Sequence, residues 1–174
     1  MEKYKKAKFL GYVTFDSGIG WIGILCSAEG LLRTTLPQPS VEEARQLLGE
    51  SVNHAIWAPH LFDDLIGRFR AYFGGHKVAF PGKLDFTEAT PFQRKVLEES
   101  RLIPYGETRS YSWLAEHIGK PGAVRAVGQA LARNPLPIIV PCHRVVARDG
   151  KLGGFSGGAE MKRYLLSLES SANI

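Results

Sequence analysis

YSWLAEHIGKPGAVRAVGQALAR (residues 111–133) predicts two short helices joined by the turn GKPG, which is the pattern of a helix–turn–helix. Ser110 stands before the first helix as an N-cap, and Asn134 with Pro135 ends the second. Helical hairpins with glycine turns are also common in proteins that bind no nucleic acid. The spacing alone therefore leaves a DNA-binding unit and an ordinary hairpin both open.

The outer face of the second helix is nearly free of long charged side chains. Ala123, Ala126 and Gln129 lie on or beside this face, and Arg125 stands among them. Small residues let a helix backbone approach another surface closely, and one projecting cation suits a narrow groove, so the pattern favours minor-groove binding. The alternative is that the alanines pack against a neighbouring helix while Arg125 forms a salt bridge.

Helix and turn signals continue on both sides of this motif. Thr90 caps a helix that begins at Pro91 and ends at about Arg101. A later hairpin is expected to turn at Asp149 and Gly150. Downstream of the motif, the sequence predicts an extended segment, this hairpin and a last helix, over 136–141, 145–155 and 158–169.

The first half of the chain predicts a three-stranded meander followed by two helices, the first with a capping box from Ser40 and Glu43. The strands are expected over 8–15, 21–27 and 31–36, and the helices over 40–48 and 59–73. A segment rich in Gly and Pro follows. The sequence therefore predicts an α+β protein: a small N-terminal β-meander/helix domain (1–85) and a mainly helical C-terminal domain with a helix–turn–helix (86–174).

Composition and charge narrow the function classes. The 174-residue chain is 44% hydrophobic and 22% charged, which is typical of globular proteins and excludes a disordered one. No apolar run approaches the roughly 20 residues of a membrane span, and the start MEKYKKAKF lacks the apolar core of a secretory signal. We therefore expect no membrane partner and an intracellular location, cytoplasmic and nucleoid-associated or nuclear.

The net charge of +5 lies wholly in the second half of the chain. Lys and Arg number 12 against 7 Asp and Glu after residue 90, and 10 against 10 before it. A polyanion would be drawn to the second half, although a merely basic surface is the simpler interpretation. Two cysteines 116 positions apart and five scattered histidines match no zinc or disulfide pattern, so we expect no metal.

IIVPCHRVV (residues 138–146) places Cys142 next to a histidine at the end of an apolar run. A lone cysteine is more often a buried small hydrophobe than a nucleophile. Here Pro141 favours a turn that exposes the thiol, and His143 and Arg144 add positive potential that favours the thiolate. The loop GGFSGG (153–158) allows a flat substrate to approach the backbone closely. These features favour a nucleophile.

IIVPCHRVV, preceded by RAVGQALARNPLP and followed by GGFSGG, resembles the O6-alkylguanine-DNA alkyltransferase family, also called methylated-DNA–protein-cysteine methyltransferases. The resemblance is strong over roughly 86–174 and rests on size and element order before that. It implies a monomer that binds double-stranded DNA containing O6-alkylguanine in the minor groove, flips the damaged base, and keeps its alkyl group. It implies a single-turnover enzyme without a cofactor.

The resemblance also assigns roles to residues. Cys142 is the implied nucleophile, His143 its base through a water molecule, and Glu169 the group that orients the histidine. Arg125 is implied to fill the gap left by the extruded base, and Asn134 to brace the turn before the cysteine. The remaining residues implied to bind DNA or the base are Tyr111, Ser112, Ala123, Ala126, Val145, Arg148, Phe155, Ser156 and Lys162.

Two departures from the family pattern and three alternatives accompany this interpretation. Cys26 lacks a partner set for the zinc found in some relatives, so we expect it to be a core residue. Phe155 stands where many relatives have a tyrosine, which leaves the selectivity among alkyl groups open. A non-catalytic binder of alkylated DNA would lack the cysteine. A Cys-His-Glu hydrolase would turn over repeatedly on an acyl substrate, and a transcriptional regulator would work without Cys142.

Overall fold

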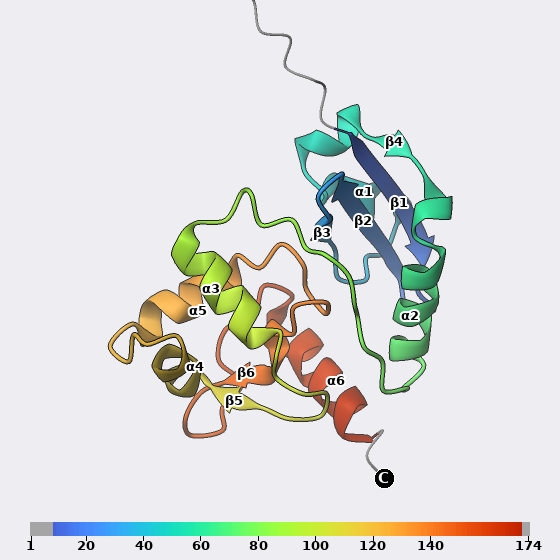
Figure 1. Cartoon of the computed structure of the whole chain (residues 1–174). Coiled ribbons are helices and arrows are strands. Elements are labelled where there is room, and N and C mark those ends of the chain that lie inside the picture. Colours follow the sequence, from blue (N-terminus) through green and yellow to red (C-terminus); the bar gives the residue numbers. More distant parts are fainter. Residues whose placement is uncertain (1–8, 172–174) are drawn as a thin grey trace, which may run out of the picture.

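The computed structural model describes residues 9–171 and has two parts in contact (Figure 1). A small sheet with helix α2 alongside it forms the N-terminal part, and a group of helices forms the C-terminal part. The predicted α+β class is therefore confirmed. None of the helices among the described residues is long and apolar enough to cross a bilayer.

The N-terminal sheet has the order β3-β2-β1-β4. Its first three strands form the predicted antiparallel meander, although Lys8, where the first prediction began, lies outside the described residues. The fourth strand was not predicted; it is two residues long and pairs in parallel with the first. The strands are β1 (Leu10–Asp16), β2 (Trp21–Ser27), β3 (Leu31–Thr34) and β4 (Ile56–Trp57).

Two helices follow the meander. The capping prediction at Ser40 is confirmed, because its side chain accepts a hydrogen bond from the backbone N–H of Glu43 at 3.2 Å. The helix expected from residue 59 begins with a separate 3₁₀ turn, and its α-helical part starts at residue 63. The elements are α1 (Val41–Gln46), the 3₁₀ helices η1 (Glu50–His54) and η2 (Pro59–Leu61), and α2 (Asp63–Phe73).

The C-terminal part contains the predicted helix–turn–helix, formed by α4 and α5. Ser110 caps α4 by accepting a hydrogen bond from the N–H of Trp113 at 3.0 Å, and Thr90 caps α3 by accepting one from Gln93 at 3.1 Å. The predicted last helix is also present. The helices are α3 (Pro91–Ser100), α4 (Tyr111–His117), α5 (Val124–Ala132) and α6 (Gly158–Ser171), with η3 (Cys142–Arg144) between α5 and α6.

Two predictions in this part are wrong. Residues 136–141 are not an extended strand but a run of turns, in which the buried Ile138 adopts a positive φ of 74° that is uncommon for a β-branched residue. The hairpin over 145–155 is also absent: β6 (Val145–Val146) pairs in parallel with β5 (Arg109–Ser110), and residues 151–155 form no strand. The turn at Gly150 is present, since its N–H donates to Ala147 O at 3.0 Å.

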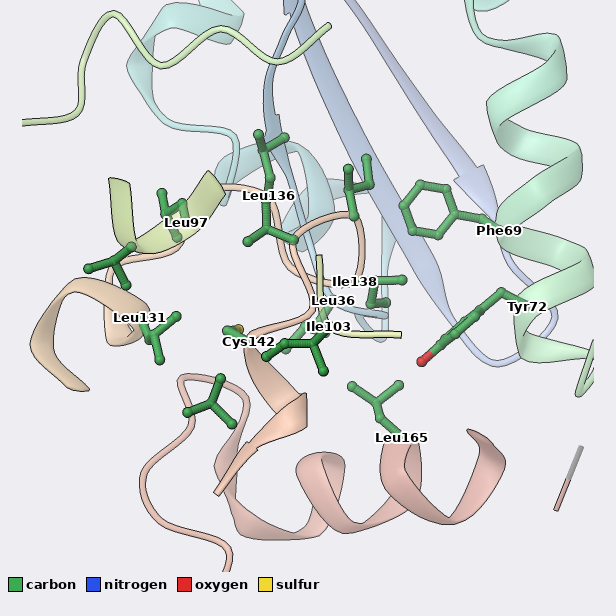
Figure 2. Close-up of a cluster of buried hydrophobic side chains, with 14 of the residues drawn as sticks. Leu36, Phe69, Tyr72, Leu97, Ile103, Leu131, Leu136, Ile138, Cys142 and Leu165 are labelled. Atoms are coloured by element: carbon green, nitrogen blue, oxygen red, sulfur yellow. The ribbon is translucent and has the colours of Figure 1, made fainter. Parts of the chain in front are cut away.

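The N-terminal sheet is joined to the segments around the cysteine. Leu31 in β3 bonds to the connecting segment at Lys83 (3.0 Å) and Asp85 (2.8 Å). The N–H of Thr34 donates to Pro135 O at 2.9 Å, and its hydroxyl donates to Pro137 O at 3.1 Å. One apolar core spans both parts, and Figure 2 shows Phe69 of α2 and Leu165 of α6 both contributing to it. The segment before Cys142 is therefore held from both parts.

Candidate active site

Cys142 begins η3, at the end of the strained run of turns. Its residue is only 5% exposed, and Figure 2 shows it inside the apolar cluster with Leu131 and Ile103. The expectation that Pro141 leads to an exposed thiol is therefore wrong. Pro141 does end regular pairing, but the 3₁₀ turn that follows directs the cysteine side chain into the protein.

The electrostatic surroundings of the thiol differ from those expected from the sequence. Burial raises the pKa of Cys142, while a hydrogen bond from the Asn134 side chain and the positive charge of Lys162 lower it. The expected influence of Arg144 is weakened, because its guanidinium is paired with a carboxylate. The cation that favours the thiolate is thus Lys162, and a nearby base is needed to remove the thiol proton.

His143 and Glu169 form a buried pair. His143 Nε2 lies 2.6 Å from Glu169 Oε1, and the two residues are 0% and 1% exposed. Burial lowers the pKa of His143, so its imidazole is neutral and able to accept a proton. Its Nδ1 is buried and has no hydrogen-bond partner among residues 9–171. His143 Nδ1 is therefore available within the core to accept or donate a hydrogen bond.

Arg144 completes the surroundings of Glu169, a contact that the sequence analysis did not identify. Its Nε and Nη2 donate to the two carboxylate oxygens at 2.9 and 3.0 Å, and Nη1 donates to Ile103 O at 2.7 Å. Burial alone would raise the pKa of Glu169, but hydrogen bonds from His143 and Arg144 lower it to about 2. The carboxylate is therefore charged whenever the protein is folded near neutral pH.

Lys162 and Tyr111 lie at the other side of the thiol. Lys162 is fully buried on α6, and its Nζ donates to Val145 O at 2.6 Å and to Gly154 O at 3.3 Å. Burial lowers the pKa of Lys162 to about 8. The Tyr111 hydroxyl lies 3.4 Å from Lys162 Nζ and donates to Gly154 O at 3.2 Å. These contacts hold the loop 153–157 against the site.

The remaining predicted site residues fall into two groups. Phe155 is half-buried and packs on the core, and the exposed Ser156 lines a hollow of about 500 Å³ with Asn134. Asn134 accepts from the Leu136 N–H and donates to Val140 O, both at 2.9 Å. The exposed or half-exposed residues Ser112, Ala123, Arg125, Ala126 and Arg148 lie outside this cluster, the first four on or beside the helix–turn–helix.

The arrangement suits nucleophilic chemistry at sulfur. A thiol, a neutral imidazole and a charged carboxylate are brought to one buried place from η3 and α6, with a lysine nearby. Among residues 9–171, no group of three or more His, Cys, Asp or Glu side chains is placed to hold a metal ion. The thiol beside a neutral imidazole can accept a group from a substrate at the Cys142 sulfur.

Comparison with known proteins agrees with this arrangement. The family model "6-O-methylguanine DNA methyltransferase, DNA binding domain" matches residues 91–171. The methylated-DNA–protein-cysteine methyltransferase of Mycobacterium bovis is 41% identical over 160 residues, which are 92% of each chain.

Solved structures are similar over nearly the whole chain. The crystal structure of Mycobacterium tuberculosis O6-methylguanine methyltransferase matches with a TM-score of 0.79 and 40% identity over 94% of each chain. A structure of the M. tuberculosis protein in complex with DNA matches with a TM-score of 0.78 and 42% identity, over 93% of this chain and 94% of that one. On this similarity of sequence and fold, the chain belongs to the methylated-DNA–protein-cysteine methyltransferase family.

Proposed function

We propose that this protein repairs DNA by moving the alkyl group of O6-alkylguanine onto the sulfur of Cys142, once per molecule. The observation that carries the proposal is the buried cluster of Cys142, His143 and Glu169. The histidine follows the cysteine in the chain, is neutral, and is hydrogen-bonded to Glu169 at 2.6 Å. Membership of the family supports it, because the relatives are named for methyl transfer from DNA to a protein cysteine.

The transfer step is a displacement at the alkyl carbon. The Cys142 sulfur attacks that carbon, a C–S bond forms, and the C–O6 bond breaks with its electron pair left on the guanine. The thiol proton passes to His143 Nδ1 through a bridging water molecule, which would satisfy this otherwise unpartnered atom. The guanine anion takes up one proton from solvent and His143 releases the thiol proton to solvent, so the net products are a thioether, an unmodified base and a neutral imidazole.

The thioether has no ready leaving group, so the thiol is not regenerated. The step changes no oxidation state and needs no Lewis acid at the alkyl carbon, so the proposal includes no cofactor and no metal. Glu169 holds the imidazole in one orientation through its bond to Nε2. Lys162 stabilises the thiolate by its charge.

Recognition of the base is proposed for residues of α4, β6 and the loop 153–157. Tyr111, Ser156 and the backbone of Val145 would bond the guanine edges, and the ring of Phe155 would stack on the base. Lys162 frames this pocket by its bonds to Val145 O and Gly154 O. Asn134 braces the turns that deliver the cysteine.

Binding of the duplex is proposed for the helix–turn–helix, with α5 in the minor groove. Arg125 and Ala126 are exposed on α5, so the backbone can approach the groove and Arg125 can fill the gap left by the flipped base. Ser112, Ala123 and Arg148 would contact the flanking DNA backbone. The proposal includes a monomer that acts where chromosomal DNA lies, in the nucleoid or the nucleus.

The test is incubation of the protein with duplex DNA that carries O6-[³H-methyl]guanine, followed by digestion and peptide analysis. Label is expected on the peptide that contains Cys142, at no more than one equivalent per protein. Cys142→Ser is the matched control, since it changes one atom and should receive no label.

Other outcomes would assign other functions. Product in catalytic excess over protein would indicate a hydrolase-like enzyme with a free thiol after each cycle. Binding to the modified duplex without any transfer would indicate a binder of alkylated DNA. Either result would overturn the proposal.

A further inference from the structure

Tyr72 brings the N-terminal part of the chain into direct contact with the buried pair. It lies near the end of α2 and is 1% exposed, and its hydroxyl points toward the side of the core where Leu165 lies (Figure 2). Tyr72 Oη donates to Glu169 Oε1 at 2.7 Å and lies 3.4 Å from His143 Nε2. Tyr72 is thus 71 and 97 positions away in sequence from two residues it touches.

The hydroxyl acts on Glu169 as a fixed donor. Burial, and next the charge of Glu169, raise the pKa of Tyr72 far above its ordinary value, so the phenol stays protonated. Glu169 Oε1 therefore receives three donors, from Tyr72 at 2.7 Å, His143 at 2.6 Å and Arg144 Nη2 at 3.0 Å. Oε2 receives Arg144 Nε at 2.9 Å and the N–H of Gly106 at 3.2 Å.

The three donors on Oε1 come from two elements: Tyr72 from α2, and His143 and Arg144 from η3. Of these, only the contribution of Tyr72 depends on the half of the chain that precedes the region matched by the family model. The geometry leads to one proposal, which rests on the alkyl transfer proposed above. We propose that Tyr72 is a positioning residue for alkyl transfer, which aligns Glu169 and, through it, the imidazole of His143.

Tyr72 also has an ordinary packing role, and the test must separate the two. Its ring makes edge contacts with Phe73, Phe80 and Tyr105 at centroid distances of 5.2, 6.0 and 6.1 Å. Tyr72→Phe keeps this ring and removes only the hydroxyl. Tyr105→Phe is the matched control, because its hydroxyl belongs to the same aromatic cluster but has no hydrogen-bond partner among the described residues.

The hydroxyl should also influence the protonation of His143. Loss of one donor leaves the Glu169 carboxylate less stabilised, so it holds a protonated imidazole more strongly and the pKa of His143 rises. A protonated His143 cannot accept the thiol proton, so the acid limb of the rate profile moves to higher pH. The titratable or charged groups around His143 are Glu169 and Lys162 of α6, Arg144 and Cys142 of η3, and Tyr72 of α2.

The experiment measures the second-order rate of methyl transfer from an O6-methylguanine duplex to the full-length protein between pH 5.5 and 9. Relative to the unaltered protein, Tyr72→Phe is expected to react about tenfold more slowly at neutral pH, the size expected when a hydrogen bond to a charged group is lost. Its acid limb is expected about half a pH unit higher. Tyr105→Phe should match the unaltered protein in both respects.

A double variant tests whether Tyr72 acts through the histidine. In a His143→Asn background, the further change Tyr72→Phe should alter the rate less than twofold, because the group that it aligns has been removed. Thermal melting of every variant shows which fraction is folded and corrects the rates for it.

Several results would overturn the proposal. The first is an unchanged rate of methyl transfer for Tyr72→Phe, and the second is a decrease in that rate that is the same at every pH. The third is an equal decrease in rate for Tyr105→Phe. The fourth is an undiminished effect of Tyr72→Phe in the His143→Asn background. Failure of the unaltered protein to accept methyl in the same assay would instead refute the proposed function itself.

Discussion

Glu169 is a charged group in the protein interior, and its charge is held by donors that exist only in the folded state. Its pKa lies near 2 in the folded protein against an ordinary value of 4.5. Because the folded-state pKa is the lower one, this group stabilises the fold above pH 4.5, and the contribution is lost as the pH falls from 4.5 toward 2. The difference corresponds to about 3 kcal/mol.

The first prediction follows from the lowered pKa of Glu169. Glu169→Gln should lower the free energy of unfolding by about 3 kcal/mol at pH 7, because the donors lose their charged acceptor. The gap between the two proteins should shrink steadily below pH 4.5, because the carboxyl of the unfolded chain takes up a proton there while the folded carboxyl does so only near pH 2. Urea unfolding at a series of pH values measures this gap.

The surface ion pair of Glu98 with Arg94 is a suitable control. Its nitrogen and oxygen are 2.8 Å apart, and its side chains are 50% and 61% exposed. Glu98→Gln should change the stability by less than about 1 kcal/mol at any pH. A gap for Glu169→Gln that stays constant down to pH 2.5 would show that the charge of this carboxyl is not what stabilises the fold.

At this scale, residue types in a motif were predictable and their burial was not. PCHR indicated a reactive cysteine beside cations, but the sequence did not show that Arg144 is neutralised by Glu169, 25 positions away. Nor did the sequence indicate that Tyr72 contacts Glu169, because its spacing is that of an ordinary buried residue of α2. Contacts of this kind are formed by tertiary packing, so no local pattern could have identified them.

In the loop 153–157, the backbone at Gly153 lies very close to the side chain of Tyr111. Gly153 has φ of +69°, and a Cβ placed on it would lie 2.6 Å from the Tyr111 hydroxyl. Gly153→Ala should therefore cost about 1–2 kcal/mol of stability and slow methyl transfer, because it forces Tyr111 away from the site. Thermal melts and transfer rates measure both effects.

Gly154 is the matched control in the same loop. A Cβ on Gly154 would meet no atom within 4 Å, and its φ is not positive. Gly154→Ala should leave the melting temperature and the rate nearly unchanged. Equal effects of the two substitutions would mean that the flexibility of the loop matters, and not the contact with Tyr111.

Helix α5 provides a prediction on duplex binding. Arg125→Ala should slow repair of O6-methylguanine in duplex DNA much more than reaction with free O6-benzylguanine, because the free base needs no extrusion. Arg133→Ala removes the same charge from the exposed end of the same helix and is the control. Both should weaken salt-dependent duplex binding to a similar extent.

The two substrates separate the possible roles of Arg125. Insertion of the Arg125 side chain into the base stack would be excluded by either of two results. One is an equal loss of reaction rate for Arg125→Ala on the duplex and on the free base. The other is a loss of rate equal to that for Arg133→Ala. Only a loss specific to the duplex and to Arg125 is consistent with it.

Elements with strong local signals were predicted well, and those that depend on distant partners were not. The meander, the capped helices and the helix–turn–helix follow from turn glycines, cap residues and apolar spacing. The segment 136–141 looked like a strand because its residues favour strands. Its backbone groups instead bond to Asn134 and to the Thr34 hydroxyl of β3, so these partners replaced the expected sheet.

The whole molecule has one core, shared by both parts, and this limits how the site can accommodate its product. Thr34 of β3 bonds to the chain just before the cysteine, and Cys142 itself belongs to the cluster that includes Val13 and Leu165. The division at residue 85 predicted from composition stays a prediction. A shared core means that distortion at Cys142 reaches the packing of both parts.

The last prediction is therefore that the alkylated protein is less stable than the free one. Cys142 is 5% exposed, so a methyl group on its sulfur must be accommodated inside close packing. Overpacking of this kind costs about 1–3 kcal/mol. For a chain of this length each kcal/mol lowers the melting temperature by about 2–4 °C, and a benzyl group should have a larger effect than a methyl group. Melting curves before and after reaction with O6-methylguanine and O6-benzylguanine measure the difference, and Cys142→Ala treated in the same way shows whether the reagents act elsewhere. Equal midpoints for the free and alkylated proteins would mean that the site opens to accept the product without disturbing the shared core.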